Sequence, residues 1–166
     1  NYDGAVPFAI AADGTRLHHE VSGPPDGEPV LMIQGLGADS RGWIRQRRAF
    51  AARHRVILFD NRGVGRSDKP EGRYDLEVMA TDAITVLDEL GIDSAHVVGA
   101  SMGGVIAQLL GVRHAHRVRS LTLACTAARH HAWRRELLAE WAQVAQEEGM
   151  GAFAPLAARW LVGPRS

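Results

Sequence analysis

Residues 96–104 read HVVGASMGG, and this stretch decides the fold. Its first four residues are typical of a short buried strand, and the apolar segment that begins at Met102 is typical of a helix. Ser101 therefore lies on a turn between a strand and a helix, inside the pattern Gly-x-Ser-x-Gly. In that context the pattern predicts a nucleophile elbow, a strained turn that exposes the serine hydroxyl. A turn that merely caps the helix is the alternative, and the additional Gly104 favours the catalytic interpretation.

Two backbone amides are candidates for an oxyanion hole beside this serine. The helix N-terminus places the N–H of Met102 next to the hydroxyl, where it can bind the negative oxygen of a tetrahedral intermediate. A second donor is expected in the loop after an earlier strand, where residues 34–37 read QGLG. The glycines allow a sharp turn that would direct the N–H of Leu36 toward Ser101. A plain turn at the end of a strand is the alternative for this segment.

The segments on either side of the elbow predict an α/β fold with a mostly parallel sheet. Four short runs are apolar almost throughout, which is typical of parallel strands buried on both faces. The dipeptide Asp13-Gly14 predicts a hairpin turn between two earlier strands. Longer segments with apolar residues at three- and four-residue spacing predict helices between the strands. The expected strands cover residues 8–12, 17–21, 30–34, 56–60, 96–99 and 121–125, and the expected helices cover residues 43–53, 76–90 and 102–113.

Residues 128–166 differ from the rest of the chain, because they predict two amphipathic helices and no strand. One apolar stripe runs over residues 133–145 and the other over residues 153–160. Pro155 is tolerable only in the first turn of the second helix, since a proline further inside removes a backbone hydrogen bond. We therefore expect residues 1–127 to form the core of the fold and residues 128–166 to begin a helical insertion.

The composition argues against several classes of partner. The 166 residues carry 19 Lys and Arg against 19 Asp and Glu, so the formal net charge is zero. A nucleic-acid-binding protein usually has a basic excess, and we therefore expect no nucleic-acid partner. No apolar run approaches the roughly 18 residues that span a membrane, and the start of the chain shows no signal-peptide pattern. We expect a cytoplasmic protein without a membrane partner.

A dinucleotide-binding site is a rival interpretation of one segment. Residues 35–40, GLGADS, imitate part of the fingerprint of such a site. Asp60 ends the next expected strand, at roughly the distance where the acidic residue of the fingerprint binds a ribose hydroxyl. Ser40, however, stands where the third glycine belongs, and this interpretation leaves residues 99–104 unexplained. We therefore expect no dinucleotide cofactor.

Other polar residues have structural explanations. The loop of residues 60–68, DNRGVGRSD, is expected to be held by internal hydrogen bonds, with bracing of a site as the alternative. The single cysteine, Cys125, lies among apolar residues and is expected to be a buried, inert thiol. The eight histidines show no spacing of zinc ligands, so we expect them to be surface residues and expect no metal.

Three segments together resemble the α/β-hydrolase fold-1 family. QGLGADSRGW, DNRGVGRSD and VGASMGG match its H-G-x-G, D-x-R-G-x-G-x-S and G-x-S-x-G-G motifs in that order. The resemblance covers residues 8 to about 127 and points to the branch with 3-oxoadipate enol-lactonases, haloperoxidase-type esterases and related carboxylesterases. It implies Ser101 as the nucleophile and the N–H groups of Leu36 and Met102 as the oxyanion hole. It also implies that residues 128–166 begin a helical cap, or lid.

The sequence departs from this family in two respects. Gln34 stands where the family has a histidine. The catalytic acid and histidine of the family lie beyond the cap, after later strands, and this sequence ends before either. No internal histidine is expected to reach the hydroxyl of Ser101. We therefore expect the chain to be the N-terminal part of a larger hydrolase, whose remainder, as a separate chain or a further segment, supplies the later strands and both residues.

The motifs and the resemblance together predict a serine hydrolase that acts on a small-molecule carboxylic ester or lactone. Ser101 would attack the carbonyl and form an acyl-enzyme, without a cofactor or a metal. The fold alone leaves open C–C bond hydrolysis, perhydrolysis and cofactor-free oxygenation. A non-catalytic protein that binds a small molecule is the alternative outside the enzymes.

Overall fold

The computed structural model describes residues 8–129 and 131–162. The chain divides into two compact units, residues 1–128 and residues 129–166. The strands of the described chain all belong to the first unit, and the second unit contains two helices. None of the helices described combines the length with the apolar character that a membrane span requires.

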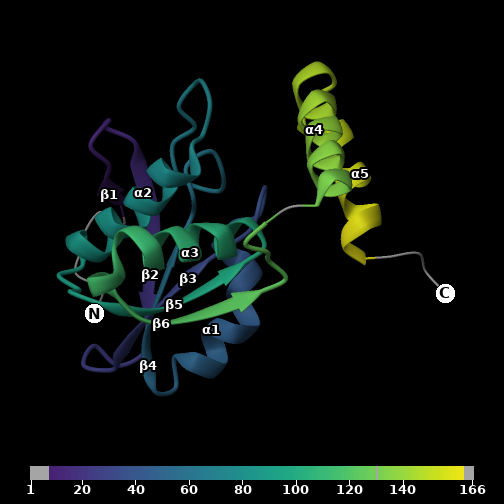
Figure 1. Ribbon diagram of the computed structural model, residues 1–166. Helices are drawn as coiled ribbons and strands as arrows, with labels where there is room; N and C mark the ends of the chain where they lie inside the picture. The colour runs from purple at the N-terminus through teal and green to yellow at the C-terminus, as the bar shows by residue number, and fades with distance from the viewer. Residues whose placement is uncertain (1–7, 130, 163–166) are drawn as a thin grey trace. The chain divides into compact units, whose positions relative to one another are not determined.

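A six-stranded sheet forms the first unit. Its strands are β1 (Phe8–Ile10), β2 (Arg16–Ser22), β3 (Glu28–Ile33), β4 (His54–Phe59), β5 (Ala95–Ala100) and β6 (Val118–Ala124). Their order in the sheet is β1-β2-β4-β3-β5-β6 (Figure 1). The first two strands form the predicted hairpin, whose turn contains Gly14 at a positive φ of 84°. β2 pairs antiparallel with β4, and every later pair is parallel, so the predicted mostly parallel sheet is confirmed.

Helices cover both faces of this sheet. They are the short 3₁₀ segments η1 (Ser40–Trp43) and η2 (Ala115–Arg117) and the α-helices α1 (Ile44–Phe50), α2 (Leu76–Glu89) and α3 (Met102–Arg113). Figure 1 shows α3 and α1 on opposite sides of the sheet. Along β3, Leu31 and Ile33 join the core beneath α2 and α3, whereas Val30 and Met32 pack with Trp43 on the other face. Because both faces are covered, the central strands carry buried apolar side chains on both faces.

The first α-helix is shorter than the one expected over residues 43–53. The carboxylate of Asp39 accepts the N–H of Arg41 and begins a 3₁₀ turn ahead of it. The helices α2 and α3, by contrast, begin and end within one residue of the predicted bounds. The side chain of Asp75 caps α2 by accepting the N–H of Glu77 at 2.7 Å.

The sixth strand lies at an edge of the sheet and is largely exposed. The exposed fractions of Leu121 and Leu123 are 38% and 44%. The prediction that this strand is buried on both faces is therefore wrong for the described chain, in which β6 pairs only with β5. The prediction of a buried Cys125 is also wrong, because this residue follows the edge strand and is exposed.

The second unit consists of α4 (Ala132–Glu147) and α5 (Met150–Val162), so the two predicted helices are confirmed. Aromatic side chains join them. The rings of Trp133 and Trp160 stack with 6.4 Å between their centroids. Trp141 meets Phe153 edge-on, with 5.8 Å between the ring centroids.

Pro155 lies inside α5 and not in its first turn, contrary to the prediction. The carbonyl of Gly149 accepts the N–H groups of Ala152 and Phe153, and the helix therefore begins earlier than the apolar stripe indicates. Proline has no N–H, so one backbone hydrogen bond is missing within this helix.

Candidate active site

Ser101 occupies the single position between the end of β5 and the start of α3. Its backbone angles are φ 53° and ψ −117°. Among the described non-glycine residues, only Ser101 and Cys125 have a positive φ. Such a conformation costs on the order of 1–3 kcal/mol and is concentrated at functional sites. The strained turn that the sequence predicts at this serine is therefore present.

Glycine is required at three positions around this turn. A Cβ at Gly99 would lie 2.3 Å from the carbonyl oxygen of Gly103. A Cβ at Gly103 would lie 2.2 Å from the carbonyl oxygen of Ile33. A Cβ at Gly104 would lie 2.6 Å from the Cβ of Thr126. The start of α3 packs this closely against the ends of β3 and β5 only because these residues lack side chains.

The loop that follows β3 lies against the serine. A Cβ built on Gly35 would be 3.2 Å from the Cβ of Ser101 and 3.7 Å from its Oγ. The N–H of Ser101 donates to the carbonyl of Ala124 at 2.9 Å, which ties the elbow to the end of β6. The structure thus brings the serine and the QGLG segment together where parallel strands end, the edge at which open α/β sheets bind ligands.

The hydrogen bonds of this region leave two backbone amides unengaged. The N–H of Gly35 donates to Oε1 of Gln34 at 3.0 Å, and the N–H of Ala38 donates to the carbonyl of Gly35 at 3.3 Å. In the part of the chain that the structure describes, no hydrogen bond uses the N–H of Leu36. Met102 is the first residue of α3, so its N–H has no acceptor within the helix. Both amides are free to bind a ligand.

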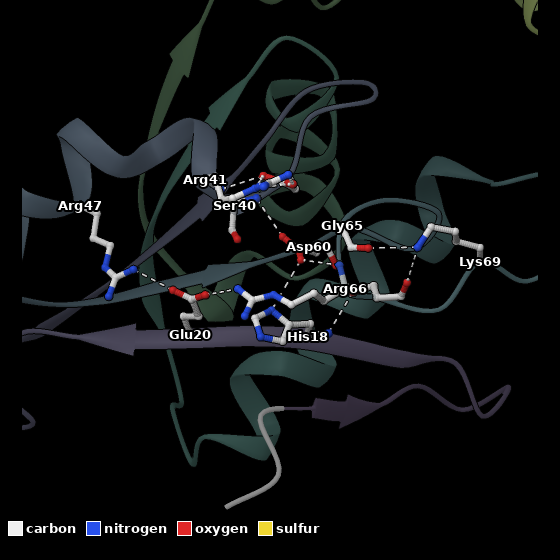
Figure 2. A network of polar contacts seen from close by, with 11 residues as sticks. His18, Glu20, Ser40, Arg41, Arg47, Asp60, Gly65, Arg66 and Lys69 are labelled. Carbon is white, nitrogen blue, oxygen red and sulfur yellow. Dashed lines mark hydrogen bonds and ion pairs between the residues drawn. The ribbon is translucent and has the colours of Figure 1, made fainter. Parts of the chain in front are cut away.

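The loop after β4 is held by internal hydrogen bonds, as the sequence predicts. The carboxylate of Asp60 accepts the N–H groups of Ser40 at 2.8 Å and Arg66 at 2.9 Å (Figure 2). Ser67 Oγ donates to the carbonyl of Asp60 at 2.5 Å and accepts the N–H of His18 at 2.9 Å. Asp60 is only 1% exposed. Its carboxylate oxygens are occupied by two backbone amides of the surrounding loops.

A buried ion pair braces the same loop against α2. The guanidinium of Arg62 donates to both carboxylate oxygens of Asp82, at 2.6 and 2.7 Å, and to Asp13 at 2.8 Å. These hydrogen bonds raise the pKa of Arg62 and lower the pKa of Asp13 below its usual range. Arg62 therefore anchors the loop to α2 and to the turn of the first hairpin.

Two histidines are buried, contrary to the prediction that all are surface residues. His18 and His19 lie on β2, between β1 and β4, with exposed fractions of 2% and 9%. Burial lowers the pKa of both imidazoles. Among the described residues, no imidazole nitrogen hydrogen bonds to Ser101, and no three potential metal ligands cluster. His130 lies outside the described residues.

A cavity of about 540 Å³ lies between η1, α1 and β2 and is not lined by the serine. Glu20 forms ion pairs with Arg47 at 2.7 Å and with Arg66 (Figure 2). Asp39 forms an ion pair with Arg41 at 2.6 Å. Because these charges are paired with one another, the cavity gives no indication of a ligand.

Two side chains hold the backbone of the QGLG segment through contacts that the sequence does not predict. The Nδ2 of Asn61 donates to the backbone carbonyl of Gln34 at 3.1 Å. The Gln34 side chain in turn holds the N–H of Gly35. Asn61 directly follows β4, and Gln34 directly follows β3. Because these strands are parallel neighbours, the residues that follow them lie at the same edge of the sheet, and this position is the signal that could have indicated the contact.

Known proteins share this fold and much of this sequence. The α/β hydrolase fold family matches residues 28–151. The putative carbamate hydrolase RutD of Azorhizobium caulinodans is 41% identical over 118 residues, which cover 71% of this chain and 43% of that protein. The 3-oxoadipate enol-lactonase 2 of Acinetobacter baylyi is 32% identical over 155 residues, which cover 91% and 56%. The chain thus spans about half the length of the curated relatives it matches.

Solved structures agree with this comparison. The enol-lactonase of Burkholderia xenovorans LB400 is similar with a TM-score of 0.86 and 34% identity, over 92% of this chain and 58% of that one. An esterase of Thermogutta terrifontis is similar with a TM-score of 0.78 and 31% identity, over 88% and 54%. The chain belongs to the α/β-hydrolase fold family.

Proposed function

We propose that this chain carries the nucleophile of a serine hydrolase that cleaves a carboxylic ester or a lactone. One observation carries the proposal. Ser101 has a positive φ on a turn between a strand and a helix, and Gly35 lies against its hydroxyl. A strained serine with backbone amides beside it has the arrangement that acyl transfer requires.

The reaction follows from this arrangement. Ser101 Oγ attacks the carbonyl carbon, and the bond to the alkoxide oxygen breaks. That oxygen takes up the proton that the serine gave up and becomes an alcohol, and water then hydrolyses the acyl-enzyme. The N–H groups of Leu36 and Met102 bind the negative oxygen of each tetrahedral intermediate. Each such donor contributes on the order of 3 kcal/mol to transition-state stabilisation. The free state of both amides supports this assignment.

A serine without a base is a weak nucleophile, and the described residues place no imidazole on Ser101. We propose that the histidine and the acid come from a segment outside this chain. The length of the matched relatives supports this proposal, since the chain covers 43% and 56% of two of them. The exposed apolar side chains of β6 support it as well, because a further strand would cover them.

We further propose that residues 128–166 begin a cap over a small-molecule site. The amphipathic pair α4 and α5 and its aromatic contacts support this role. An apolar acyl or ring substituent is the substrate class that aromatic side chains of a cap accept. The cytoplasmic location stays a prediction from the sequence.

Carbamate hydrolysis is a second candidate, because the relative that is 41% identical is a putative carbamate hydrolase. Attack on a carbamate carbonyl uses the same serine and the same amides, so the site does not separate the two substrates. Rates with 4-nitrophenyl acetate, an enol-lactone and an alkyl carbamate, each measured on the intact natural protein, decide between them.

The test of the proposed function is hydrolysis by the intact natural protein and by its Ser101→Ala variant. We expect the variant to lose at least about three orders of magnitude in kcat, as serine hydrolases without their nucleophile do. A variant with the activity of the wild type would contradict the proposal. Identification of the reaction products distinguishes ester or lactone hydrolysis from C–C bond hydrolysis, perhydrolysis and oxygenation.

A further inference from the structure

The loop between β3 and η1 is held at two points by consecutive residues of another loop. The Nδ2 of Asn61 donates to the carbonyl of Gln34 at 3.1 Å. The Oδ1 of Asp60 accepts the N–H of Ser40 at 2.8 Å, as Figure 2 shows. Residues 35–39, which include the proposed oxyanion donor, lie between these two anchors.

The first anchor acts on a peptide unit that is enclosed from both sides. A Cβ at Gly103 would lie 2.7 Å from the carbonyl oxygen of Gln34, so the first turn of α3 closes one side. Asn61 contacts the same oxygen. The amide hydrogen of this peptide unit, the N–H of Gly35, donates to Oε1 of Gln34 at 3.0 Å. Both polar groups of the peptide unit that joins residues 34 and 35 are therefore bound.

The next peptide unit is held at one end only. Its carbonyl, on Gly35, accepts the N–H of Ala38 at 3.3 Å. In a trans peptide the carbonyl and the N–H point in opposite directions, so this hydrogen bond sets the direction of the N–H of Leu36. Glycine allows either peptide orientation at little cost. The orientation of the donor therefore depends on this hydrogen bond together with the anchor at Gln34, which fixes the preceding peptide unit.

We propose that Asn61 is a positioning residue that holds the oxyanion loop so that the N–H of Leu36 faces the hydroxyl of Ser101. The inference rests on the proposed function. Asn61 is 2% exposed, and its Oδ1 has no hydrogen-bond partner among the described residues. Because the carbonyl of Gln34 only accepts, the amide nitrogen of Asn61 must face it. Without this amide, the carbonyl of the first peptide unit loses its hydrogen bond, and we expect the donor to shift away from the reacting oxygen.

The test compares Asn61→Ala with Asp75→Ala in the intact natural protein. The control removes the side chain that caps α2, outside the loop that carries Asn61. We expect Asn61→Ala to lower kcat about 10- to 100-fold with little change in KM, since small displacements of catalytic groups have effects of this size. We expect the control to lower Tm and to leave kcat unchanged. An equal fall in kcat for both variants, or a change confined to KM, would overturn the inference.

A second variant keeps the shape of the side chain and covers the case in which the alanine variant does not fold. In Asn61→Asp the carboxylate cannot donate, but the protonated carboxyl can. We expect the ratio of its kcat to that of the wild type to rise as the pH falls, because burial and the neighbouring Asp60 raise the pKa of a carboxyl placed there. A ratio independent of pH would overturn the inference.

The Ser101→Ala variant separates this inference from the proposed function. If Ser101→Ala is as active as the wild type, the proposed function fails, and the positioning role fails with it. If Ser101→Ala is inactive while Asn61→Ala keeps the kcat of the control variant, only the positioning role fails.

Discussion

At the scale of single residues, backbone strain is concentrated at the proposed nucleophile. Ser101 has a positive φ, a backbone conformation that glycine adopts without strain but that is unfavourable for a residue with a Cβ. The surrounding glycines allow this conformation, and the hydrogen bond from its N–H to Ala124 supports it. The same strain that presents the hydroxyl therefore reduces the stability of the fold.

The first prediction concerns this strain. We expect Ser101→Gly to raise the free energy of unfolding by about 1 kcal/mol. Glycine relieves the backbone strain, and its greater freedom in the unfolded chain offsets part of that gain. Urea denaturation measures the change. Ser101→Ala is the control, since it removes the hydroxyl and keeps the Cβ. A glycine variant that is less stable than the alanine variant would contradict the account of the elbow.

The second prediction concerns the close approach at the elbow. We expect Gly103→Ala to lower the free energy of unfolding by about 1–3 kcal/mol, because the new methyl would collide with the carbonyl of Ile33. Gly151, inside α5, has nothing within 4 Å of an added Cβ. There we expect Gly151→Ala to raise the stability by up to about 1 kcal/mol. Equal effects of the two substitutions, measured by urea denaturation, would refute the steric explanation.

At the scale of elements, β2 carries two buried histidines, His18 and His19. Burial lowers the pKa of His18 and His19, whereas in the unfolded chain both have a pKa of about 6.5. The unfolded state therefore binds protons that the folded state does not. Stability is complete above this pH and is lost as the pH falls through and below it.

The third prediction follows from this difference in proton binding. We expect the free energy of unfolding to fall between pH 7.5 and 5.5, and we expect the double variant His18→Gln/His19→Gln to reduce that dependence. Urea denaturation at a series of pH values measures the effect. An equal slope in the double variant and the wild type would show that folding does not lower the pKa of these imidazoles.

The elements differ in how far their sequence predicts them. The helix α2 follows directly from apolar spacing, because it packs one face on the sheet. The helix α3 follows from its apolar run after the elbow. The 3₁₀ turn before α1 depends on the side chain of Asp39, which the periodicity does not report. The burial of His18 and His19 depends on the pairing of β2 with β4, a long-range contact that local patterns do not contain.

The candidate site also contains residues that the sequence predicts and a contact that it does not predict. Ser101 and the QGLG segment are predictable because their chemistry is written in consecutive residues. The contact between Asn61 and Gln34 joins residues that are 27 positions apart, and it exists because β3 and β4 are parallel neighbours. A single sequence does not specify which neighbouring loops touch, so this anchor is visible only in the structure.

At the scale of the whole molecule, the edge strand β6 leaves apolar side chains exposed. Unpaired apolar edges favour association with another strand. This observation supports the proposal that a further segment continues the sheet.

The fourth prediction tests that proposal by amide hydrogen exchange in the intact natural protein. We expect the outward-facing amides of β6 to exchange slowly, because a further strand would accept their hydrogen bonds. The opposite edge strand, β1, is the control within the same sheet, and its outward amides should exchange fast. Equally fast exchange at both edges would contradict the proposal that the sheet continues beyond β6.

The central claim of this account is that the hydroxyl of Ser101 attacks the substrate. A fluorophosphonate, which forms a stable tetrahedral adduct with an activated serine, tests it most directly. Mass spectrometry of the labelled intact protein locates the adduct. We predict a single adduct on the peptide that contains Ser101 and none in Ser101→Ala. An adduct on another residue, or labelling of the alanine variant at the rate of the wild type, would contradict the claim.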